Sequence, residues 1–300
     1  MRNYATLFDM NYWPKWYVMY RSWLQWSTPG DVLWVLPMDH ETFEFMSKRG
    51  PWRRVELLDP RVVIGDAKEP AGKPIVMKNR RSHAEFCWMM APWLCHHVIF
   101  DLHKKDVTYL DADLWFTSPL KKVWDEIQDA SSDVVAAVTP HRFHPDDVAR
   151  LLPNGVYNVS WVSFLNDPAA KAVLRRWANQ VMDRCDASTC GDQKYLDEWP
   201  RILGPQLHEF KNHGIGVAPW NARCYEFSKG PSFRKAGAEP EKLPDPVVFY
   251  HFHELRRRGP GDYHLTGYQL PTSCIEHVYS PYLRELESAY DLLAELKRNQ

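Results

Sequence analysis

The chain has 300 residues, 45% of them hydrophobic, and a formal net charge of −1. This length fits one domain, or one domain with an elaboration, and it allows a substantial buried core. Because binding along a nucleic-acid backbone requires a clear basic excess, the charge excludes nucleic acid as a bulk partner.

The six cysteines include no CxxC pair and no histidine at metal-type spacing, which argues against a zinc or thioredoxin-like site. The N-terminal segment has no apolar core of the signal-peptide type. The most apolar stretch, FCWMMAPWLCHHVIF, is interrupted by Pro92, His96 and His97. We therefore expect no membrane span and a cytoplasmic location, either free or peripheral at the inner face of the membrane.

Short strand-like runs alternate with amphipathic stretches in the first half of the chain. Pro14 lies in the first turn of one expected helix, and Asp39 is the expected N-cap of the next. The expected elements are strands at 4–8, 31–36 and 55–58 and helices at 14–26 and 39–48. This alternation predicts a mainly parallel sheet covered by helices.

Residues 65–74 are rich in Pro, Gly and charge, which predicts a loop. Ser82 and Glu85 have the spacing of a capping box for a helix that ends near residue 97. That helix leads to VTYLDADLWF (107–116), a strand that places the DAD triplet at its carboxyl end. In open α/β sheets, ligands bind at this edge.

The remaining elements follow the same signals. They are a helix at 121–127, strands at 134–138 and 156–165, a helix at 168–184, a loop entering a short helix at 190–200, a strand at 247–250, a basic loop at 254–261 and a final helix at 282–298.

The DAD triplet places two carboxylates on one side of an extended segment, because residues i and i+2 point the same way. At about 6 Å, Asp111 and Asp113 repel by roughly 3 kcal/mol at an effective dielectric of 20, so a partly buried pair needs a cation. Mg²⁺ or Mn²⁺ fits, since such an ion completes its shell with substrate phosphates. The triplet alone is also compatible with solvated loop carboxylates.

Several motifs in order give the chain a resemblance to a known family. It resembles the GT-A nucleotide-sugar glycosyltransferases, especially the retaining family 8 group that contains glycogenin and bacterial lipopolysaccharide galactosyltransferases. It is more similar still to a bacterial branch of glycosyltransferases that begin with an ATLFD-NY strand and carry YLDAD, GDQKYLD-WP and FYHFH. The similarity covers roughly residues 4–258.

The resemblance implies an α/β GT-A fold, with a Rossmann-like, mainly parallel central sheet flanked by helices. Residues 1–260 are the expected catalytic domain, and 261–300 are a C-terminal extension with the terminal helix. The implied activity moves a sugar from a nucleotide-diphosphate donor to a hydroxyl acceptor, with retention of anomeric configuration. The expected donor is a UDP- or TDP-sugar, and the expected acceptor is a glycan, a lipid-linked sugar or a small molecule.

The resemblance also implies a metal site for Mn²⁺ or Mg²⁺. Its ligands are Asp111, Asp113 and a late histidine that matches His251 better than His253. The family has glycine three residues after this histidine, whereas this chain has Glu254. On spacing alone, a histidine at the end of an apolar strand is equally compatible with a packed core residue.

Donor contacts are implied at several further positions. Asp9, Asn11 and Tyr12 match the base-binding turn, where a carboxylate accepts from a pyrimidine imide and a Tyr ring stacks on the base. The alternative is an ordinary helix entry. Arg80, in the run KNRR, offers a bidentate fork for diphosphate or sugar, or is a solvated charge.

The resemblance places five more residues around the diphosphate and the sugar. Ala112 and Arg256 are the further diphosphate contacts, with Arg256 the first of three consecutive arginines. Asn158 and the catalytic pair Asp192 and Gln193 match positions near the sugar ring and its anomeric carbon, where they would stabilise a cationic transition state. Asp192 could instead cap the helix that follows it.

Two other functions are compatible with such a fold. A sugar nucleotidyltransferase requires a Gly-rich, Lys-containing loop after the first strand, and LFDMNYWPKW contains no glycine. A non-catalytic module that binds nucleotide sugars or glycans would bind metal and donor without transfer.

Overall fold

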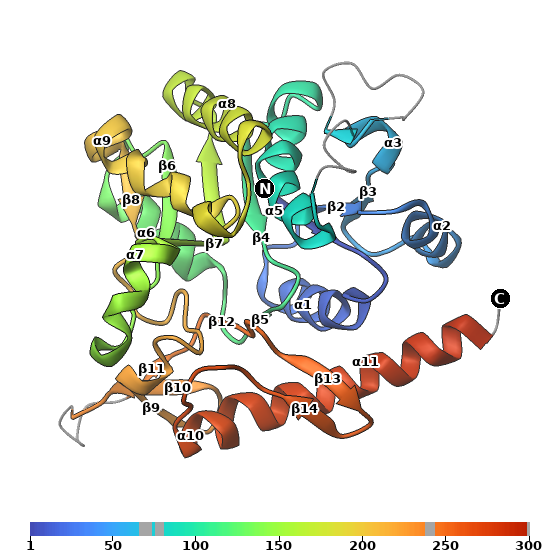
Figure 1. Ribbon diagram of the computed structural model, residues 1–300, viewed down its shortest axis with the longest axis vertical. Coiled ribbons are helices and arrows are strands. Elements are labelled where there is room, and N and C mark those ends of the chain that lie inside the picture. The colour runs from blue at the N-terminus through green and yellow to red at the C-terminus, as the bar shows by residue number, and fades with distance from the viewer. Residues whose placement is uncertain (66–73, 76–80, 238–243, 299–300) are drawn as a thin grey trace.

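The computed structural model describes residues 1–65, 74–75, 81–237 and 244–298. A seven-stranded sheet lies at its centre with helices on both faces (Figure 1). The strands are β1 (Asn3–Phe8), β2 (Val32–Pro37), β3 (Val55–Leu57), β4 (Asp106–Leu110), β6 (Ala136–Pro140), β7 (Tyr157–Leu165) and β8 (Leu207–Glu209). Their order is β3-β2-β1-β4-β7-β6-β8, and among them only β7 runs antiparallel to its neighbours. The sheet is therefore mainly parallel, as predicted.

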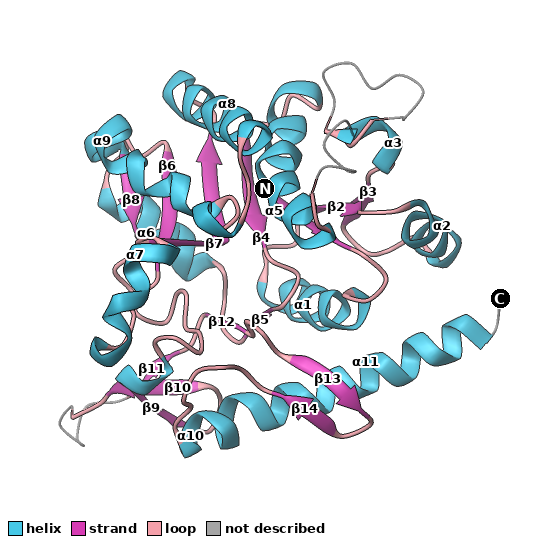
Figure 2. Ribbon diagram, viewed as in Figure 1, coloured by secondary structure: helices cyan, strands magenta, loops and turns pink. Residues whose placement is uncertain are grey.

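Helices cover the two faces of this sheet (Figure 2). The longer ones are α1 (Trp13–Trp26), α2 (His40–Arg49), α5 (His83–His96), α6 (Lys121–Ala130), α8 (Pro168–Asp183) and α11 (Ser280–Arg298). The shorter ones are α3 (Pro60–Val63), α7 (Leu151–Asn154), α9 (Trp199–Leu203) and α10 (Thr272–Cys274).

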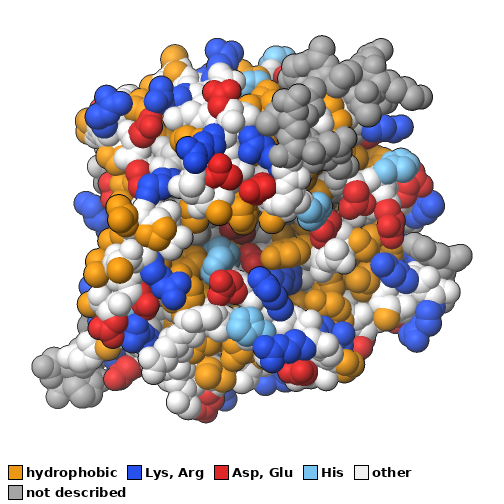
Figure 3. All heavy atoms as spheres, in the orientation of Figure 1, with side chains coloured by type: hydrophobic (Ala, Val, Ile, Leu, Met, Phe, Trp, Pro, Cys, Tyr) orange, Lys and Arg blue, Asp and Glu red, His pale blue; other side chains and the backbone are white. Residues whose placement is uncertain are grey.

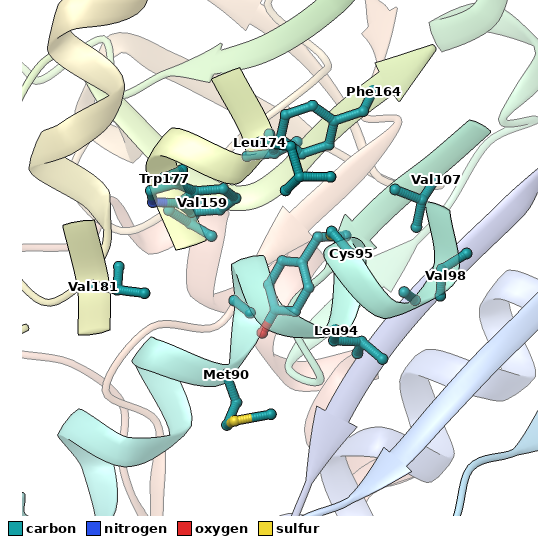
Figure 4. Close-up of a cluster of buried hydrophobic side chains, with 14 of the residues drawn as sticks. Met90, Leu94, Cys95, Val98, Val107, Val159, Phe164, Leu174, Trp177 and Val181 are labelled. Atoms are coloured by element: carbon teal, nitrogen blue, oxygen red, sulfur yellow. The ribbon is translucent and has the colours of Figure 1, made fainter. Parts of the chain in front are cut away.

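The strands divide their side chains between two hydrophobic cores, as the period of two requires. In β1, Ala5 and Leu7 join the core that contains α5 and α8, while Tyr4 and Phe8 join the core that contains α1 and α6. Figure 4 shows the first of these cores, where side chains of α5 and α8 meet those of β4 and β7. This packing fixes both helices against β4 and β7, and β4 leads directly to the DAD triplet.

The C-terminal third builds a smaller layer beneath the carboxyl edge of the sheet (Figure 1). Its strands are β9 (Tyr225–Ser228), β10 (Ser232–Lys235), β11 (Asp245–Pro246), β12 (Phe249–His251), β13 (Arg256–Gly259) and β14 (Asp262–His264). The earlier strand β5 (Leu114–Phe116) joins this layer. β12 pairs antiparallel with β5, and β13 forms a hairpin with β14. A third core joins these segments to α11.

Local signals in the sequence located many elements well. Asp39 caps α2 by accepting from the Thr42 backbone N–H at 2.7 Å. The capping box of Ser82 and Glu85 begins α5, as predicted. The loop expected at 65–74 lies mostly outside the described residues.

Two expectations about the strands were wrong. Residues 107–116 form two strands rather than one, because β4 ends at Leu110 and β5 pairs with β12 instead of continuing in the main sheet. The basic segment 254–261 is not a loop, since Arg256–Gly259 is β13. Alternation within ten residues cannot distinguish one strand from two that have different partners, and a charged hairpin lacks the apolar signal of a strand.

Within the described residues, no helix combines the length and the apolar character needed to cross a membrane.

Candidate metal centre and surrounding cleft

Two carboxylates and an imidazole converge where the chain leaves β4. The ligand atoms of Asp111, Asp113 and His251 all lie within 4.8 Å of one another. His251 Nε2 is 3.2 Å from Asp113 Oδ1 and 3.7 Å from Asp111 Oδ2. Figure 3 shows acidic, basic and histidine side chains gathered around a hollow on this face. The structure thus brings together the three residues predicted as metal ligands.

Backbone hydrogen bonds fix this arrangement. The Asp111 N–H donates to the Ser160 carbonyl at 3.2 Å, which ties the bend to β7. The Phe252 N–H donates to the Asp113 carbonyl at 3.0 Å, and His251 lies opposite Leu114 in the β5–β12 register. The pairings of β4 with β7 and of β5 with β12 therefore hold the ligands, although the paired strands are far apart in the sequence.

The charges of the cluster favour a bound cation. Burial raises the pKa of Asp111 to about 6, and the nearby charge of Asp113 adds to this, although His251 opposes it. Burial alone would also raise the pKa of Asp113, yet the charges of His251 and Lys15 hold it well below its usual range. Two carboxylate oxygens and one imidazole nitrogen are a donor set that suits Mn²⁺ or Mg²⁺.

His253, the alternative ligand, lies outside this cluster. Its Nε2 is 3.8 Å from Glu254 Oε1, and its side chain is 45% exposed. The Trp220 ring packs against both histidines, with ring centroids 5.4 Å from His251 and 5.5 Å from His253. The indole therefore helps to fix the orientation of both imidazole rings.

Lys15 is a functional candidate that the sequence analysis did not select. It lies in the first turn of α1, is only 6% exposed, and places Nζ 3.5 Å from Asp113 Oδ2. Its Nζ also lies 4.3 Å from the centre of the Tyr12 ring. Burial lowers the pKa of Lys15, and Asp113 opposes this effect. The available signal was a single lysine within the aromatic run NYWPKWY.

The predicted base-binding turn follows β1 at the same sheet edge. Asp9 Oδ1 accepts from the Tyr12 backbone N–H at 3.0 Å, and Asp9 Oδ2 accepts from His83 Nε2 at 2.8 Å. Asn11 is exposed, and Tyr12 is 44% exposed. Asp9 therefore shapes the turn and anchors α5, and His83 is a second residue that the sequence analysis missed.

Asn158, Asp192 and Gln193 also meet near the centre. Asn158 Nδ2 donates to Gln193 Oε1 at 2.8 Å, and Gln193 Nε2 donates to the Asn154 carbonyl at 2.7 Å. The Trp177 indole N–H donates to the Asp192 carbonyl at 2.9 Å. Burial, and next the charge of Asp111, raise the pKa of Asp192 well above its usual value.

Of the two predicted arginine contacts, Arg80 and Arg256, the structure describes only Arg256. Arg80 lies outside the described residues. Arg256 is exposed on β13, while its neighbour Arg257 pairs with Glu287 of α11 at 2.9 Å. Arg81 donates to three backbone carbonyls at the end of α8, which gives it a structural role.

Comparisons with known proteins come from whole-chain similarity, since no protein-family model matches the sequence. The uncharacterized protein YfnD of Bacillus subtilis (strain 168) is 24% identical over 271 residues, which span 86% of this chain and 80% of YfnD. Mouse xyloside xylosyltransferase 1, solved in its apo form, superposes with a TM-score of 0.50 and 13% identity, covering 83% of this chain and 97% of that one.

A second solved structure covers more of the chain. The galactosyltransferase LgtC, solved in complex with donor and acceptor sugar analogues, superposes with a TM-score of 0.52 and 15% identity over 95% of both chains. Likenesses at this level of identity establish the fold. The chain therefore has the GT-A fold that its sequence motifs predicted.

Proposed function

We propose that this chain is a glycosyltransferase that uses a divalent ion to transfer a sugar from a nucleoside-diphosphate donor to a hydroxyl acceptor. The observation that carries the proposal is the convergence of Asp111, Asp113 and His251 at the carboxyl edge of a GT-A sheet. The solved complex of LgtC with donor and acceptor sugar analogues supports a sugar-transfer role for a chain with this fold. The acceptor class we propose is a hydroxyl on a glycan, on a lipid-linked sugar or on a small molecule.

The donor base is proposed to be uracil or thymine. The turn of Asp9, Asn11 and Tyr12 lies beside the metal ligands, because β1 and β4 are neighbouring parallel strands. Both Asp9 oxygens already accept hydrogen bonds within the protein. We therefore assign base stacking to the Tyr12 ring and leave Asp9 the task of holding the turn.

In the transfer step, the bond between the sugar C1 and the diphosphate oxygen breaks, and a bond from C1 to the acceptor oxygen forms. A divalent ion bound by Asp111, Asp113 and His251 would stabilise negative charge on the leaving diphosphate, an effect worth several kcal/mol. Asp192 and Asn158 are proposed to face the sugar. Gln193 positions Asn158, since its amide oxygen accepts from Asn158 Nδ2.

Two routes give retention of configuration. In one, the Asp192 carboxylate attacks C1 and expels the diphosphate, and the acceptor oxygen then displaces Asp192 while its proton passes to the released diphosphate. In the other, the acceptor attacks on the face that the diphosphate leaves, and its proton passes to the departing phosphate oxygen. The second route does not require an ionised Asp192, whose pKa is raised by burial and by the charge of Asp111.

The donor class is tested by thermal shift with four nucleoside diphosphates and their sugars, each with and without Mn²⁺. We expect uridine or thymidine diphosphate to raise the melting temperature only when the metal is present. Full binding in EDTA would contradict metal dependence, and the largest shift with guanosine diphosphate would contradict the pyrimidine assignment. Metal-dependent binding without hydrolysis or transfer would identify a binding module instead.

The ligand set is tested by Asp111→Asn, Asp113→Asn and His251→Ala, each expected to weaken Mn²⁺-dependent binding by at least about tenfold. His253→Ala is the matched control, because His253 lies outside the cluster. If the His253 variant lost binding and the His251 variant kept it, the third metal ligand would be His253 instead of His251.

The stereochemical outcome is read by proton NMR of the first-formed product. We expect an α-linked donor to give an α-linked product. An Asp192→Asn variant that remains active would exclude the covalent route, whereas a β-linked product would exclude both routes.

A further inference from the structure

Lys15 is a buried cation whose partners in the protein are few. It is 6% exposed, and removing an ammonium from water is costly unless other groups replace the lost hydration. Its 3.5 Å contact with Asp113 is longer than the roughly 2.7–2.9 Å of a charge-assisted hydrogen bond. Within the described residues, no closer hydrogen bond to this ammonium is found, so its N–H donors can serve another acceptor.

The two oxygens of Asp113 face different groups. Oδ1 is 3.2 Å from His251 Nε2, while Oδ2 is 3.5 Å from Lys15 Nζ. The other contact of the ammonium is the Tyr12 ring, at 4.3 Å. Lys15 therefore touches a proposed metal ligand on one side and, on the other, the turn proposed to hold the donor base. In a nucleotide-sugar donor, the diphosphate lies between the nucleoside and the sugar. A group between the metal ligands and the base-binding turn therefore lies where we expect the diphosphate.

The charge balance of the site gives this position a purpose. The carboxylates of Asp111 and Asp113 cancel the charge of a divalent ion, and a metal-bound His251 is neutral. Without Lys15, the centre formed by the ion and its three ligands would have no net charge, so only direct coordination by the ion and the more distant, exposed Arg256 would attract an anionic diphosphate. With Lys15, the loaded centre carries a net positive charge. The Tyr12 ring lies against the ammonium that supplies this charge.

We infer that Lys15 binds the diphosphate of the donor beside Asp113 and supplies the net positive charge that two carboxylates and a divalent ion lack. This inference rests on the proposed function. It implies opposite effects on the two partners of the site, because the same ammonium repels the metal ion and attracts the phosphates.

The test measures Mn²⁺ alone, by electron paramagnetic resonance of the free ion, and then the nucleoside diphosphate that binds the wild type best, by calorimetry at saturating Mn²⁺. For Lys15→Met we expect Mn²⁺ to bind several-fold more tightly and the diphosphate about 10- to 100-fold more weakly. Lys15→Arg should keep most of the diphosphate affinity. Lys104→Met is the control, since Lys104 precedes β4 and so lies at the opposite end of that strand.

Because the Met variant could misfold, Lys15→Gln is measured in parallel and folding is checked by circular dichroism. Unchanged diphosphate affinity in a folded variant would overturn the role of Lys15 alone. Equal weakening of Mn²⁺ and diphosphate would show a merely structural role and would also overturn it. A wild-type chain that binds none of the diphosphates with Mn²⁺ would instead contradict the proposed function, and this inference would fall with it.

Discussion

Gly191, immediately before Asp192, allows Trp88 of α5 to lie against the backbone. Its φ is +66°, and a Cβ there would lie 2.8 Å from Trp88 Cε3. Trp88 is 44% exposed although it packs on this turn. Because Trp88 is held by the turn that leads to Asp192 and remains partly accessible, we expect it to contribute to binding of the donor sugar.

We predict that Gly191→Ala lowers the free energy of unfolding by about 2–3 kcal/mol and weakens donor-sugar binding, because the new methyl group displaces Trp88. Urea denaturation and calorimetry with the sugar donor measure the two effects. Gly230→Ala is the control, since Gly230 also has a left-handed φ of +81° but has no atom within 4 Å of its Cβ position. Equal losses in both variants would attribute the effect to backbone strain alone.

Glu254 occupies the position where the family pattern has glycine, and it keeps a glycine-like backbone with φ at +63°. Its Oε2 accepts from the Gly267 N–H at 2.9 Å. Glu254 therefore has a left-handed backbone of the kind that glycine adopts most easily. A left-handed residue other than glycine costs about 1–2 kcal/mol, which this hydrogen bond partly offsets.

We predict that Glu254→Gly is more stable than Glu254→Ala by about 1 kcal/mol, because both lose the bond to Gly267 but only glycine relieves the strain. Paired urea denaturation curves provide the comparison. Equal stabilities would mean that the left-handed backbone at Glu254 is not strained.

At the scale of elements, one carboxylate of α11 makes several contacts with the β13–β14 hairpin. Glu287 pairs with Arg257 at 2.9 Å and accepts from the Tyr263 hydroxyl at 2.6 Å and from the Gly261 N–H at 2.8 Å. The hydrogen bonds from Arg257, with smaller contributions from Tyr263 and Gly261, lower the pKa of Glu287 to about 2. Ionised Glu287 therefore stabilises the folded state.

We predict a pH-dependent difference between the wild type and Glu287→Gln. The wild type should be about 1–2 kcal/mol more stable at neutral pH, after allowance for solvent screening. A lowered pKa gives stability that is present above the unfolded value near 4.5 and is lost as the pH falls through about 2. Thermal unfolding from pH 7 to pH 2 tests this, and a difference that stayed constant over the range would disprove the linkage.

Elements set by local chemistry were predicted well from the sequence. The Asp39 cap and the capping box of Ser82 and Glu85 each act within four residues, so the sequence contains the whole interaction. β13 was missed because it is a charged strand without apolar alternation, and its contacts include Glu287, thirty residues beyond Arg257. The break between β4 and β5 was missed because β12, the partner of β5, lies in the last quarter of the chain.

For the whole molecule, α11 connects the C-terminal extension to the metal centre. The Tyr282 ring stacks on Phe252 with centroids 3.6 Å apart, and the Phe252 N–H donates to the Asp113 carbonyl. The division at residue 260 stays a prediction. Because Tyr282 is buried in the core that contains Trp115 and Phe252, we expect the extension and the catalytic domain to fold together.

We predict that Tyr282→Ala costs about 3–5 kcal/mol of stability and also weakens Mn²⁺ binding, because it removes the support beneath β12. Tyr282→Phe is the matched control. The Tyr282 hydroxyl is buried and has no hydrogen-bond partner among the described residues, so Phe should be neutral or slightly stabilising. Strong destabilisation by Phe would reveal a partner for the hydroxyl.

The candidate site was only partly accessible to sequence reasoning. Asp111, Asp113 and His251 were found through motifs and meet as expected. Lys15 and Trp88 carry no motif, and their positions depend on where α1 and α5 pack against the sheet. A buried lysine and a half-exposed tryptophan become distinctive only when their neighbours in space are known.

The antiparallel pairing of β5 with β12 joins two segments that are far apart in the sequence. His251 follows Asp113 by 138 residues (251 − 113). During synthesis, the two aspartates leave the ribosome well before the histidine does. The nascent chain therefore presents only an incomplete set of ligands until the segment that contains His251 has been made and β12 has paired with β5. Binding of the proposed ion would in this way depend on the pairing of β5 with β12, so a bound ion would report that this pairing has formed.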